Sequence, residues 1–344
     1  MERILGGLYI SSIQPLLDKV DFKKNYNITH ILSVLPGPIP NEDEYLKNYV
    51  HKQIEVEDDD LTNIIQFFPE CNKFIDSVLF PQGFNAKEKK PQKHAGAVLI
   101  HCAQGCSRSV TIVCAYLMRT YGLDVEKALF AVKRKKADIS PNDNFLEQLK
   151  LYEFLLNKDD FLNDKIYRQW LLMHNVKLDP TGSQLIQEKD FFKNDTGIQE
   201  NGMGKFIELR CKRCRQRLAS SNTFVPHDPP SSSSEDKQSL FIRKAPHSNR
   251  IISMEQGANF CSHYYVEPLR WMQEELLKGE LEGKFKCLKC DAKVGGYCWQ
   301  GSRCSCGRWM IPAIYLQSNK VDACEVKKDI IHSVRVNSNN DSIS

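Results

Sequence analysis

Short apolar runs alternate with amphipathic stretches of helical length over the first 157 residues. The runs are brief and rich in Val, Ile and Leu, as buried strands are, and they lie at 8–10, 30–34 and 97–101. Stretches of helical length lie at 63–79 and 110–121. The second of these ends at Gly122, a residue typical of helix ends. Alternating strands and helices predict an α/β domain over residues 1–157, with a central sheet and flanking helices.

The pattern changes after residue 157. Apolar residues at helical spacing predict a helix over 159–173, and the polar, Gly- and Pro-containing stretch 175–204 predicts a flexible linker. We therefore assign 158–204 to a helix and linker. Residues 205–325 read as a small, mainly β domain built around cysteine pairs, and 326–344 as a disordered tail. Within this domain, the serine run 231–234 is predicted to be a disordered loop.

Composition limits the class of protein. The chain has 344 residues, 41% hydrophobic and 26% charged, which is enough for two domains. No apolar run approaches the ~20 residues of a membrane span, and residues 1–35 lack the features of a signal peptide. We therefore expect a soluble, unexported protein. Its 13 cysteines then indicate metal binding in a reducing compartment rather than disulfides.

The stretch 101–109, His-Cys-Ala-Gln-Gly-Cys-Ser-Arg-Ser, joins the last predicted strand to a helix. Backbone amides and a helix N-terminus in such a turn bind anions, and Arg108 can donate two hydrogen bonds to a phosphate. The same positive field favours a thiolate at Cys102, which makes it a candidate nucleophile. The predicted phosphate-binding residues are Ala103, Gln104, Gly105, Cys106, Ser107 and Arg108.

These residues match, without gaps, the HCxxGxSRS signature of the dual-specificity protein phosphatases, which the chain resembles. The resemblance implies an enzyme that removes phosphate from tyrosine, serine and threonine through a cysteinyl-phosphate intermediate, with no cofactor for catalysis. It also implies that Ser109 hydrogen-bonds the sulfur and assists its departure, and that His101 orders the loop. The segment Ser140-Pro141-Asn142 resembles the family segment that packs under this loop, where Asn142 is expected to be structural.

A carboxylate must protonate the leaving oxygen, and the acidic run 55–60 lies upstream of the loop. Alignment of its flanks with the family pattern puts the general acid at Asp58, with Asp59 as the alternative. Some members of the run are expected only to cap the following helix. The acid is further from the cysteine than is usual in the family, and we assign the excess to a surface insertion at 80–94. Cys106 is a candidate for a reversible disulfide with Cys102, and Cys114 is the rival partner.

The second domain carries two CxxC pairs and one CxC, an arrangement typical of zinc sites. Seven cysteines need an eighth ligand to close two tetrahedral structural sites, and His227 and His263 are the candidates. The segment 261–272 resembles the C-terminal zinc-binding domain of one phosphatase subfamily, and this resemblance favours His227. We favour one site of Cys211, Cys214, Cys287 and Cys290, and one of His227, Cys261, Cys304 and Cys306. Of the six remaining cysteines, the four at 71, 114, 298 and 324 are expected to be buried thiols.

Charge suggests a partner for the second domain. The basic excess of the chain falls in 205–344, and five cations crowd the first CxxC pair: Arg210, Lys212, Arg213, Arg215 and Arg217. They are either a solvated face or a surface for RNA or a ribonucleoprotein. The subfamily resemblance implies a role in late assembly of the large ribosomal subunit, binding to pre-ribosomal particles, and a location in cytoplasm and nucleus. The alternative function is an assembly factor or nucleic-acid-binding zinc module in which phosphatase activity is dispensable.

Overall fold

The computed structural model describes residues 1–39, 45–81, 96–158, 160–182, 186, 191–195, 206–227, 241–243, 251–253 and 261–326. These residues form two compact units, Met1–Arg168 and Gln169–Ser344. The boundary falls within one helix, α8 (Lys165–Leu178). Each unit is described by itself below.

A five-stranded sheet forms the centre of the first unit, with strand order β1-β2-β5-β3-β4. Its strands are β1 (Glu2–Leu5), β2 (Leu8–Ser11), β3 (Ile28–Val34), β4 (Val50–Ile54) and β5 (Ala97–His101). All neighbours are parallel except β1 and β2. The central strand β5 is buried along its whole length, because helices cover both faces of a parallel sheet.

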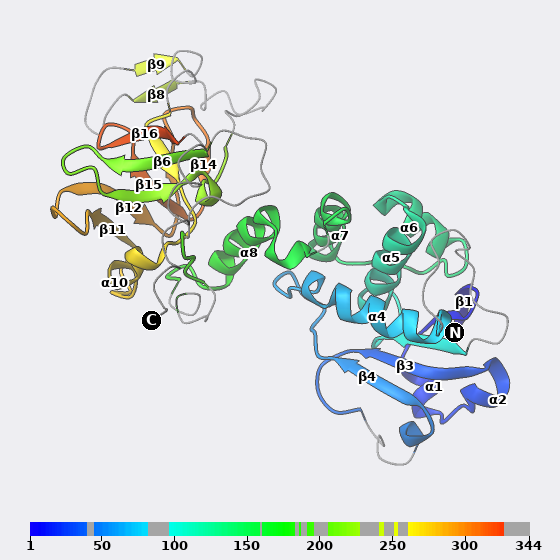
Figure 1. Ribbon diagram of the computed structural model, residues 1–344. Coiled ribbons are helices and arrows are strands. Elements are labelled where there is room, and N and C mark those ends of the chain that lie inside the picture. The colour runs from blue at the N-terminus through cyan, green and yellow to red at the C-terminus, as the bar shows by residue number, and fades with distance from the viewer. Residues whose placement is uncertain are drawn as a thin grey trace, which may run out of the picture. The chain divides into compact units, whose positions relative to one another are not determined.

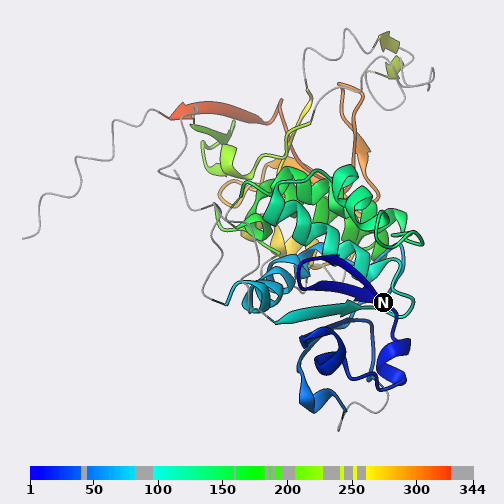
Figure 2. The same cartoon turned by 90° about the vertical axis from the view of Figure 1, so that its right-hand side faces the viewer.

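Helices lie on both faces of this sheet, as Figures 1 and 2 show. They are α1 (Gln14–Leu17), α2 (Phe22–Tyr26), α4 (Phe68–Leu79), α5 (Arg108–Tyr121), α6 (Val125–Lys133) and α7 (Asp143–Leu155), with short 3-10 turns at Leu46–Asn48, Ile65–Phe67 and Phe161–Asn163. On one face, α4 and α5 pack on β3 and β5. On the other, Phe22 from α2 packs with Ile31 and Leu99 of the sheet. The predicted α/β fold with flanking helices is therefore confirmed.

The second unit is mainly β, as predicted. Its strands are β6 (Phe206–Cys211), β7 (Arg217–Ser220), β8 (Phe241–Arg243), β9 (Ile251–Ser253), β10 (His263–Tyr265), β11 (Glu282–Lys286), β12 (Lys293–Cys298), β13 (Ser302–Arg303), β14 (Trp309–Met310), β15 (Ala313–Gln317) and β16 (Val321–Val326). The larger sheets have the orders β10-β15-β12-β11 and β16-β6-β7. Besides α8, the described helical segments are α10 (Gln273–Leu276) and short turns at Ser221–Thr223 and Arg270–Met272. Trp299 and Tyr297 are fully buried in its core.

The segment 175–204 does not behave as a flexible linker where the structure describes it. Val176, Ile186 and Phe192 are buried in the core of the second unit, together with Leu209 and Trp299. Burial of these three apolar side chains stabilises the segment in the core, although most of its neighbouring residues in the sequence are polar. Most of the insertion 80–94, the serine loop 231–234 and the tail after residue 326 lie outside the described residues. No helix in the described ranges has the length and hydropathy of a membrane span.

Candidate active site and metal centres

The loop 102–107 runs from the end of β5 to the start of α5, at the carboxyl edge of the parallel strands, where α/β proteins bind ligands. Gly105 adopts φ 77°, and a Cβ there would lie 2.6 Å from the backbone of Ser11. The amide of Ile13 donates to the carbonyl of Ala103. Only glycine therefore allows the loop to turn this closely against the end of β2.

Cys102 lies at the bottom of this loop and is almost completely buried. Its sulfur accepts a hydrogen bond from the backbone amide of Gly105 at 3.1 Å and lies 3.3 Å from the hydroxyl of Ser109. Both groups can donate to a sulfur anion. These contacts hold the sulfur at the centre of the loop, where it can reach a bound phosphate.

Arg108 is the first residue of α5, and its guanidinium is buried beside the loop. One terminal nitrogen donates to the carbonyl of Val56 at 3.0 Å. The Nε atom is 3.6 Å from Asp58 Oδ2, too far for a hydrogen bond, and it has no hydrogen-bond partner among the described residues. Buried donors are normally satisfied, so an unpartnered Nε beside the loop 102–107 fits a site that an anion completes.

The structure separates the two candidate acids. Asp58 Oδ1 accepts hydrogen bonds from the Ser107 hydroxyl at 2.8 Å and from the Asn142 side-chain amide at 2.7 Å. Asp59 is turned to the following backbone, where Oδ1 accepts from the amides of Leu61 and Thr62. Of the two carboxylates, Asp58 contacts the phosphate loop and Asp59 caps a turn.

Two polar residues, Asn142 at the N-cap of α7 and Gln148 on α7, hold the acidic segment. From the sequence, Asn142 was expected to be structural and Gln148 was not singled out. Asn142 caps α7 by accepting from the Phe145 amide, and the same side chain donates to Asp58. Gln148 accepts from the amides of Ile64 and Ile65 and donates to the carbonyl of Thr62. A buried glutamine that uses both ends of its amide fixes the segment that follows the acid.

His101 is fully buried behind Cys102. Burial lowers its pKa to about 4, so the ring is neutral at neutral pH. Its Nε2 lies 2.6 Å from the Ser33 hydroxyl, which is in turn 2.8 Å from His51 Nε2. The ring therefore links β5 to β3 through Ser33, a partner that local sequence did not indicate.

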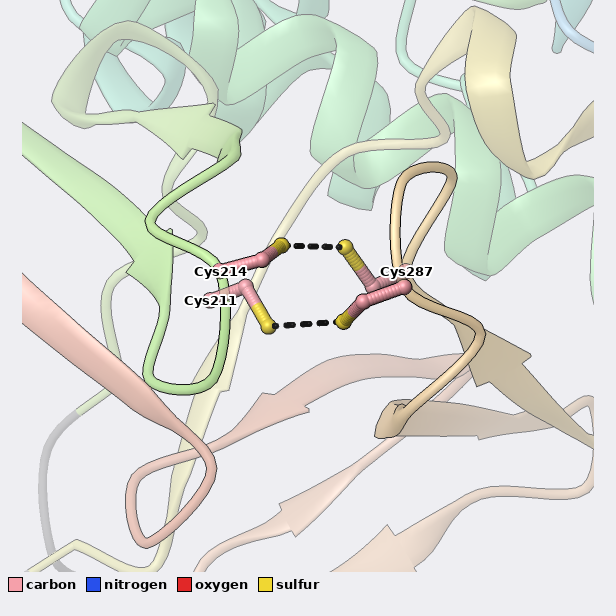
Figure 3. A group of neighbouring side chains, drawn as sticks. Cys211, Cys214 and Cys287 are labelled. Atoms are coloured by element: carbon pink, nitrogen blue, oxygen red, sulfur yellow. Dashed lines mark hydrogen bonds between the residues drawn. The ribbon is translucent and has the colours of Figure 1, made fainter.

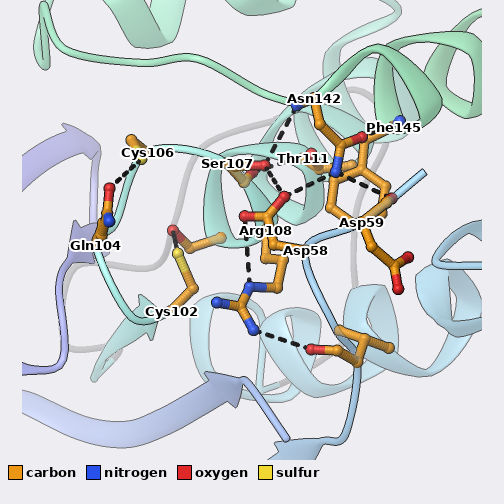
Figure 4. Close-up of polar contacts among 12 residues, drawn as sticks. Asp58, Asp59, Cys102, Gln104, Cys106, Ser107, Arg108, Thr111, Asn142 and Phe145 are labelled. Carbon is orange, nitrogen blue, oxygen red and sulfur yellow. Dashed lines mark hydrogen bonds and ion pairs between the residues drawn. The ribbon is translucent and has the colours of Figure 1, made fainter. Parts of the chain in front are cut away.

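Cys106 is partly exposed, and its thiol donates to the Gln104 side chain. Burial, with the nearby charges of Cys102 and Asp58, raises its pKa above the usual range. Figure 4 shows its side chain beside Gln104 and not directed at Cys102. Cys114 is buried within α5, where burial raises its pKa to about 12. Neither geometry favours the disulfide considered from the sequence.

Four cysteine sulfurs from two similar turns form the first cluster, in which all ligand atoms lie within 4.8 Å of one another. Cys211 ends β6 and Cys214 lies in the turn that follows, while Cys287 and Cys290 lie in the turn after β11. Figure 3 shows Cys211, Cys214 and Cys287 facing one another across the cluster. Two sulfur pairs are 3.5 and 3.7 Å apart. A tetrahedral zinc with bonds of about 2.3 Å requires sulfur pairs roughly 3.8 Å apart, so this group fits the metal.

The two turns share one backbone geometry. The residue after each second cysteine, Arg215 or Asp291, has a positive φ, 61° and 55° respectively. Its amide donates to the carbonyl of the first cysteine of the same turn, Cys211 or Cys287. Such tight turns direct two sulfurs the same way, which pre-forms half of a tetrahedral site.

The second cluster consists of His227, Cys261, Cys304 and Cys306. His227 Nε2 lies 3.2 Å from the sulfur of Cys304 and 3.4 Å from that of Cys261. His263 interacts with Cys304 from outside this group, while its Nδ1 faces the Ser262 hydroxyl. The structure thus brings together the two sets of four favoured from the sequence, and places His227 rather than His263 in the second. Both clusters are compatible with zinc.

The remaining cysteines divide into two kinds. Cys71 and Cys114 are buried, as predicted. Cys298 and Cys324 are partly exposed, so the prediction of buried thiols was wrong for them. Cys324 lies on β16, which pairs with β6, and its side chain is near solvent. Its sulfur accepts a hydrogen bond from Arg215.

Comparison with known proteins agrees with the geometry of the loop. The family model "Dual specificity phosphatase, catalytic domain" matches residues 8–154. The chain is 46% identical to "Tyrosine-protein phosphatase YVH1" of Saccharomyces cerevisiae, covering 93% of this chain and 90% of the relative. It is 35% identical to "Tyrosine-protein phosphatase yvh1" of Schizosaccharomyces pombe, covering 94% and 84%. Among solved structures, the Yvh1 phosphatase domain from Chaetomium thermophilum matches with 31% identity and a TM-score of 0.39, covering 46% of this chain and 98% of that chain.

Proposed function

Because this chain belongs to the dual-specificity protein phosphatases of the Yvh1 type, we propose that it cleaves phosphoproteins through a phosphocysteine at residue 102. The thiolate of Cys102 attacks phosphorus, and the bond from phosphorus to the substrate oxygen breaks. The observation that carries this proposal is the buried sulfur at 3.1 Å from the Gly105 amide, beside the orphaned Nε of Arg108.

Arg108 and the loop amides supply the electrostatic part of the reaction. The guanidinium is held by Val56 and approached by Asp58, so its orientation is set before substrate arrives. Donors fixed in advance around the transferring phosphoryl group stabilise charge in the transition state at no reorganisation cost.

Asp58 acts as the general acid in the first step and as the base in the second. It protonates the leaving oxygen, then takes a proton from the water that attacks the phosphocysteine. That attack breaks the P–S bond and releases inorganic phosphate and the Cys102 thiolate. Ser109, 3.3 Å from the sulfur, donates to the departing thiolate. Ser107 and Asn142 hold the carboxylate in place.

Both cysteine clusters are proposed to bind structural zinc, two ions per chain. Eight protein ligands fill two tetrahedra and leave no position for a reacting water. The metal therefore supplies folding energy to the second unit. Catalysis requires no cofactor in this proposal.

The second unit is proposed to serve late assembly of the large ribosomal subunit, through contact with RNA of pre-ribosomal particles in cytoplasm and nucleus. The support is the resemblance of 261–272 to the zinc domain of the assembly subfamily and the basic excess of residues 205–344. An assembly factor with dispensable phosphatase activity remains the alternative, and the polar contacts built around Asp58 and Arg108 favour an active enzyme.

One experiment tests the enzymatic proposal. Wild-type protein and Cys102→Ser are incubated with 4-nitrophenyl phosphate, and the wild-type reaction is quenched in acid to trap phosphocysteine. We expect a phosphorylated peptide containing Cys102 in the wild type only, with no turnover by the variant. Turnover by Cys102→Ser would contradict the mechanism. Comparing cells that carry Cys102→Ser with cells lacking the gene tests whether the activity is dispensable.

A further inference from the structure

The cations around the first CxxC pair fall into two groups that sequence could not separate. Arg210 pairs with Glu208 at 2.6 Å. Arg217 pairs with Asp195 at 2.9 Å and lies 3.5 Å from Glu208. Arg215 pairs with Asp322. These three arginines are therefore largely neutralised within the unit and stabilise the β6–β7 and β16 segments.

The second group is exposed and surrounds a cavity. Lys212, Arg213, Lys293 and Lys320 line a hollow of about 410 Å³, together with Asn319 and the edge of Cys211. In the described part of the chain, no carboxylate pairs with Arg213, Lys293 or Lys320. Lys212 reaches Asp322 only at 4.0 Å, and Arg215 already engages that carboxylate.

Three separate segments bring these cations together. Lys212 and Arg213 lie between the cysteines of the first turn, Lys293 begins β12, and Lys320 precedes β16. Like charges gathered on one surface repel each other, and Asp322, the carboxylate nearest to Lys212, is already paired with Arg215. A zinc held by four thiolates would carry net negative charge and offset only part of this excess. The hollow therefore keeps a positive potential that favours an anion.

We propose that this hollow is where the second unit binds the phosphate backbone of RNA. The inference rests on the RNA contact proposed above, and it assigns that contact to Lys212, Arg213, Lys293 and Lys320. Three of the four are lysines, which act as mobile point charges suited to a backbone whose phosphates vary in position. A phosphopeptide presents one compact dianion, which is better bound by buried, bidentate arginines. The four exposed cations of the hollow therefore favour RNA, an extended polyanion, over a phosphopeptide.

Binding is tested with full-length, zinc-loaded protein and a fluorescent single-stranded RNA of about 12 nucleotides, by anisotropy across roughly 50–200 mM KCl. The variant Arg213→Ala/Lys320→Ala removes two cations of the hollow. For single strands, each neutralised phosphate contributes about 0.7 to the slope of log K against log[salt]. We expect the slope to fall by about 1.4 and the affinity to fall about 10-fold or more.

The matched control is Lys133→Ala/Arg134→Ala, which removes the same charge from an exposed basic run in the first unit. We expect its RNA affinity and slope to stay at wild-type values. Zinc content and hydrolysis of 4-nitrophenyl phosphate should be unchanged in both variants, which shows that the fold is intact.

The possible results distinguish failure of this RNA site from failure of the proposed RNA contact and of the proposed phosphatase activity. Wild-type protein that does not bind RNA would overturn the RNA contact and this site together, while leaving the phosphatase proposal standing. Wild-type binding that survives Arg213→Ala/Lys320→Ala, or falls equally in the control, would overturn the site alone. If Arg213→Ala/Lys320→Ala loses phosphopeptide binding but retains RNA binding, the hollow is a phosphopeptide site and the assignment to RNA is refuted.

Discussion

Asn142 performs two tasks with one side chain, and two substitutions separate them. Its Oδ1 accepts from the Phe145 amide and caps α7, while its Nδ2 donates to Asp58 at 2.7 Å. Asn142→Ala removes both contacts. Asn142→Asp keeps an oxygen that can cap the helix, and replaces the donor to Asp58 with a like charge.

The two effects have different expected sizes. Loss of an N-cap costs about 1 kcal/mol of stability, so Asn142→Ala should loosen the first turn of α7 and Asn142→Asp should not. A hydrogen bond to a charged group contributes roughly 1.5–3 kcal/mol. If that contact orients the acid, its loss slows acid-dependent steps about 10- to 100-fold in either variant.

Two measurements read these effects independently. Hydrogen exchange at the Phe145 amide reports the cap, and we expect faster exchange in Asn142→Ala only. Turnover of a phosphoserine peptide reports the acid, because its alkoxide is a poor leaving group. For 4-nitrophenyl phosphate we compare kcat/KM, which reports only formation of the phosphocysteine and not the later step in which Asp58 acts as base. Its leaving group needs little protonation, so kcat/KM of both variants should remain within about threefold of the wild type.

Phosphoserine turnover by Asn142→Asp at the wild-type rate would show that Asn142 does not hold the acid. An equal loss on both substrates would also refute the reasoning, because it would mean that the phosphate loop itself had been disturbed. Asp59→Asn serves as the matched control, since Asp59 Oδ1 caps a turn by accepting from the amides of Leu61 and Thr62. It should leave the ratio of the two rates unchanged.

Three further predictions follow from the site, the clusters and the buried histidine. Arg108→Lys should reduce kcat by at least about 100-fold in a steady-state assay, because the lysine ammonium cannot make the two fixed hydrogen bonds that the guanidinium makes to phosphate. A rate near that of the wild type would contradict the role assigned to Arg108. Metal analysis should return two zinc ions per chain in the wild type and one in Cys287→Ser/Cys290→Ser. That variant should still hydrolyse 4-nitrophenyl phosphate, because the catalytic loop lies in the other unit. Two zinc ions in the variant would refute the ligand set. The pKa of His101 falls from 6.5 to about 4 on folding, so between these pH values the unfolded state binds a proton that the folded state does not. The free energy of unfolding should therefore fall by up to about 3 kcal/mol as pH drops from 6.5 to 4. In urea unfolding, His101→Gln should show a flatter pH dependence over this range, and a profile identical to that of the wild type would count against this assignment.

Local patterns in the sequence were enough to locate the phosphate loop. A strand, a tight turn and a helix are set by short-range periodicity and by residues such as Gly105 and Gly122. The chemistry of Cys102 and Arg108 depends on their spacing across that turn. The paired cysteines were equally readable, because a CxxC turn directs both sulfurs to one side whatever surrounds it.

Long-range contacts decided the remaining assignments. Asp58 and Asp59 are adjacent and chemically identical; the family resemblance favoured Asp58, and its contacts with Ser107 and Asn142 are the physical difference between the two. His227 and His263 were equivalent by residue type, and only folding places His227 among the sulfurs. The segment 175–204 looked flexible by composition, yet Phe192 is buried in the second unit.

Sequence by itself determined which groups this chain can bring to phosphate and to metal, because the groups of each motif lie within a few residues of each other along the chain. Tertiary structure decided which charges remain available. Arg215 and Arg213 stand two positions apart in one basic run, but folding pairs Arg215 with Asp322, more than a hundred residues away, and leaves Arg213 at the edge of an open hollow. Ion pairing acts through space over a few ångströms, so no local pattern could separate the two.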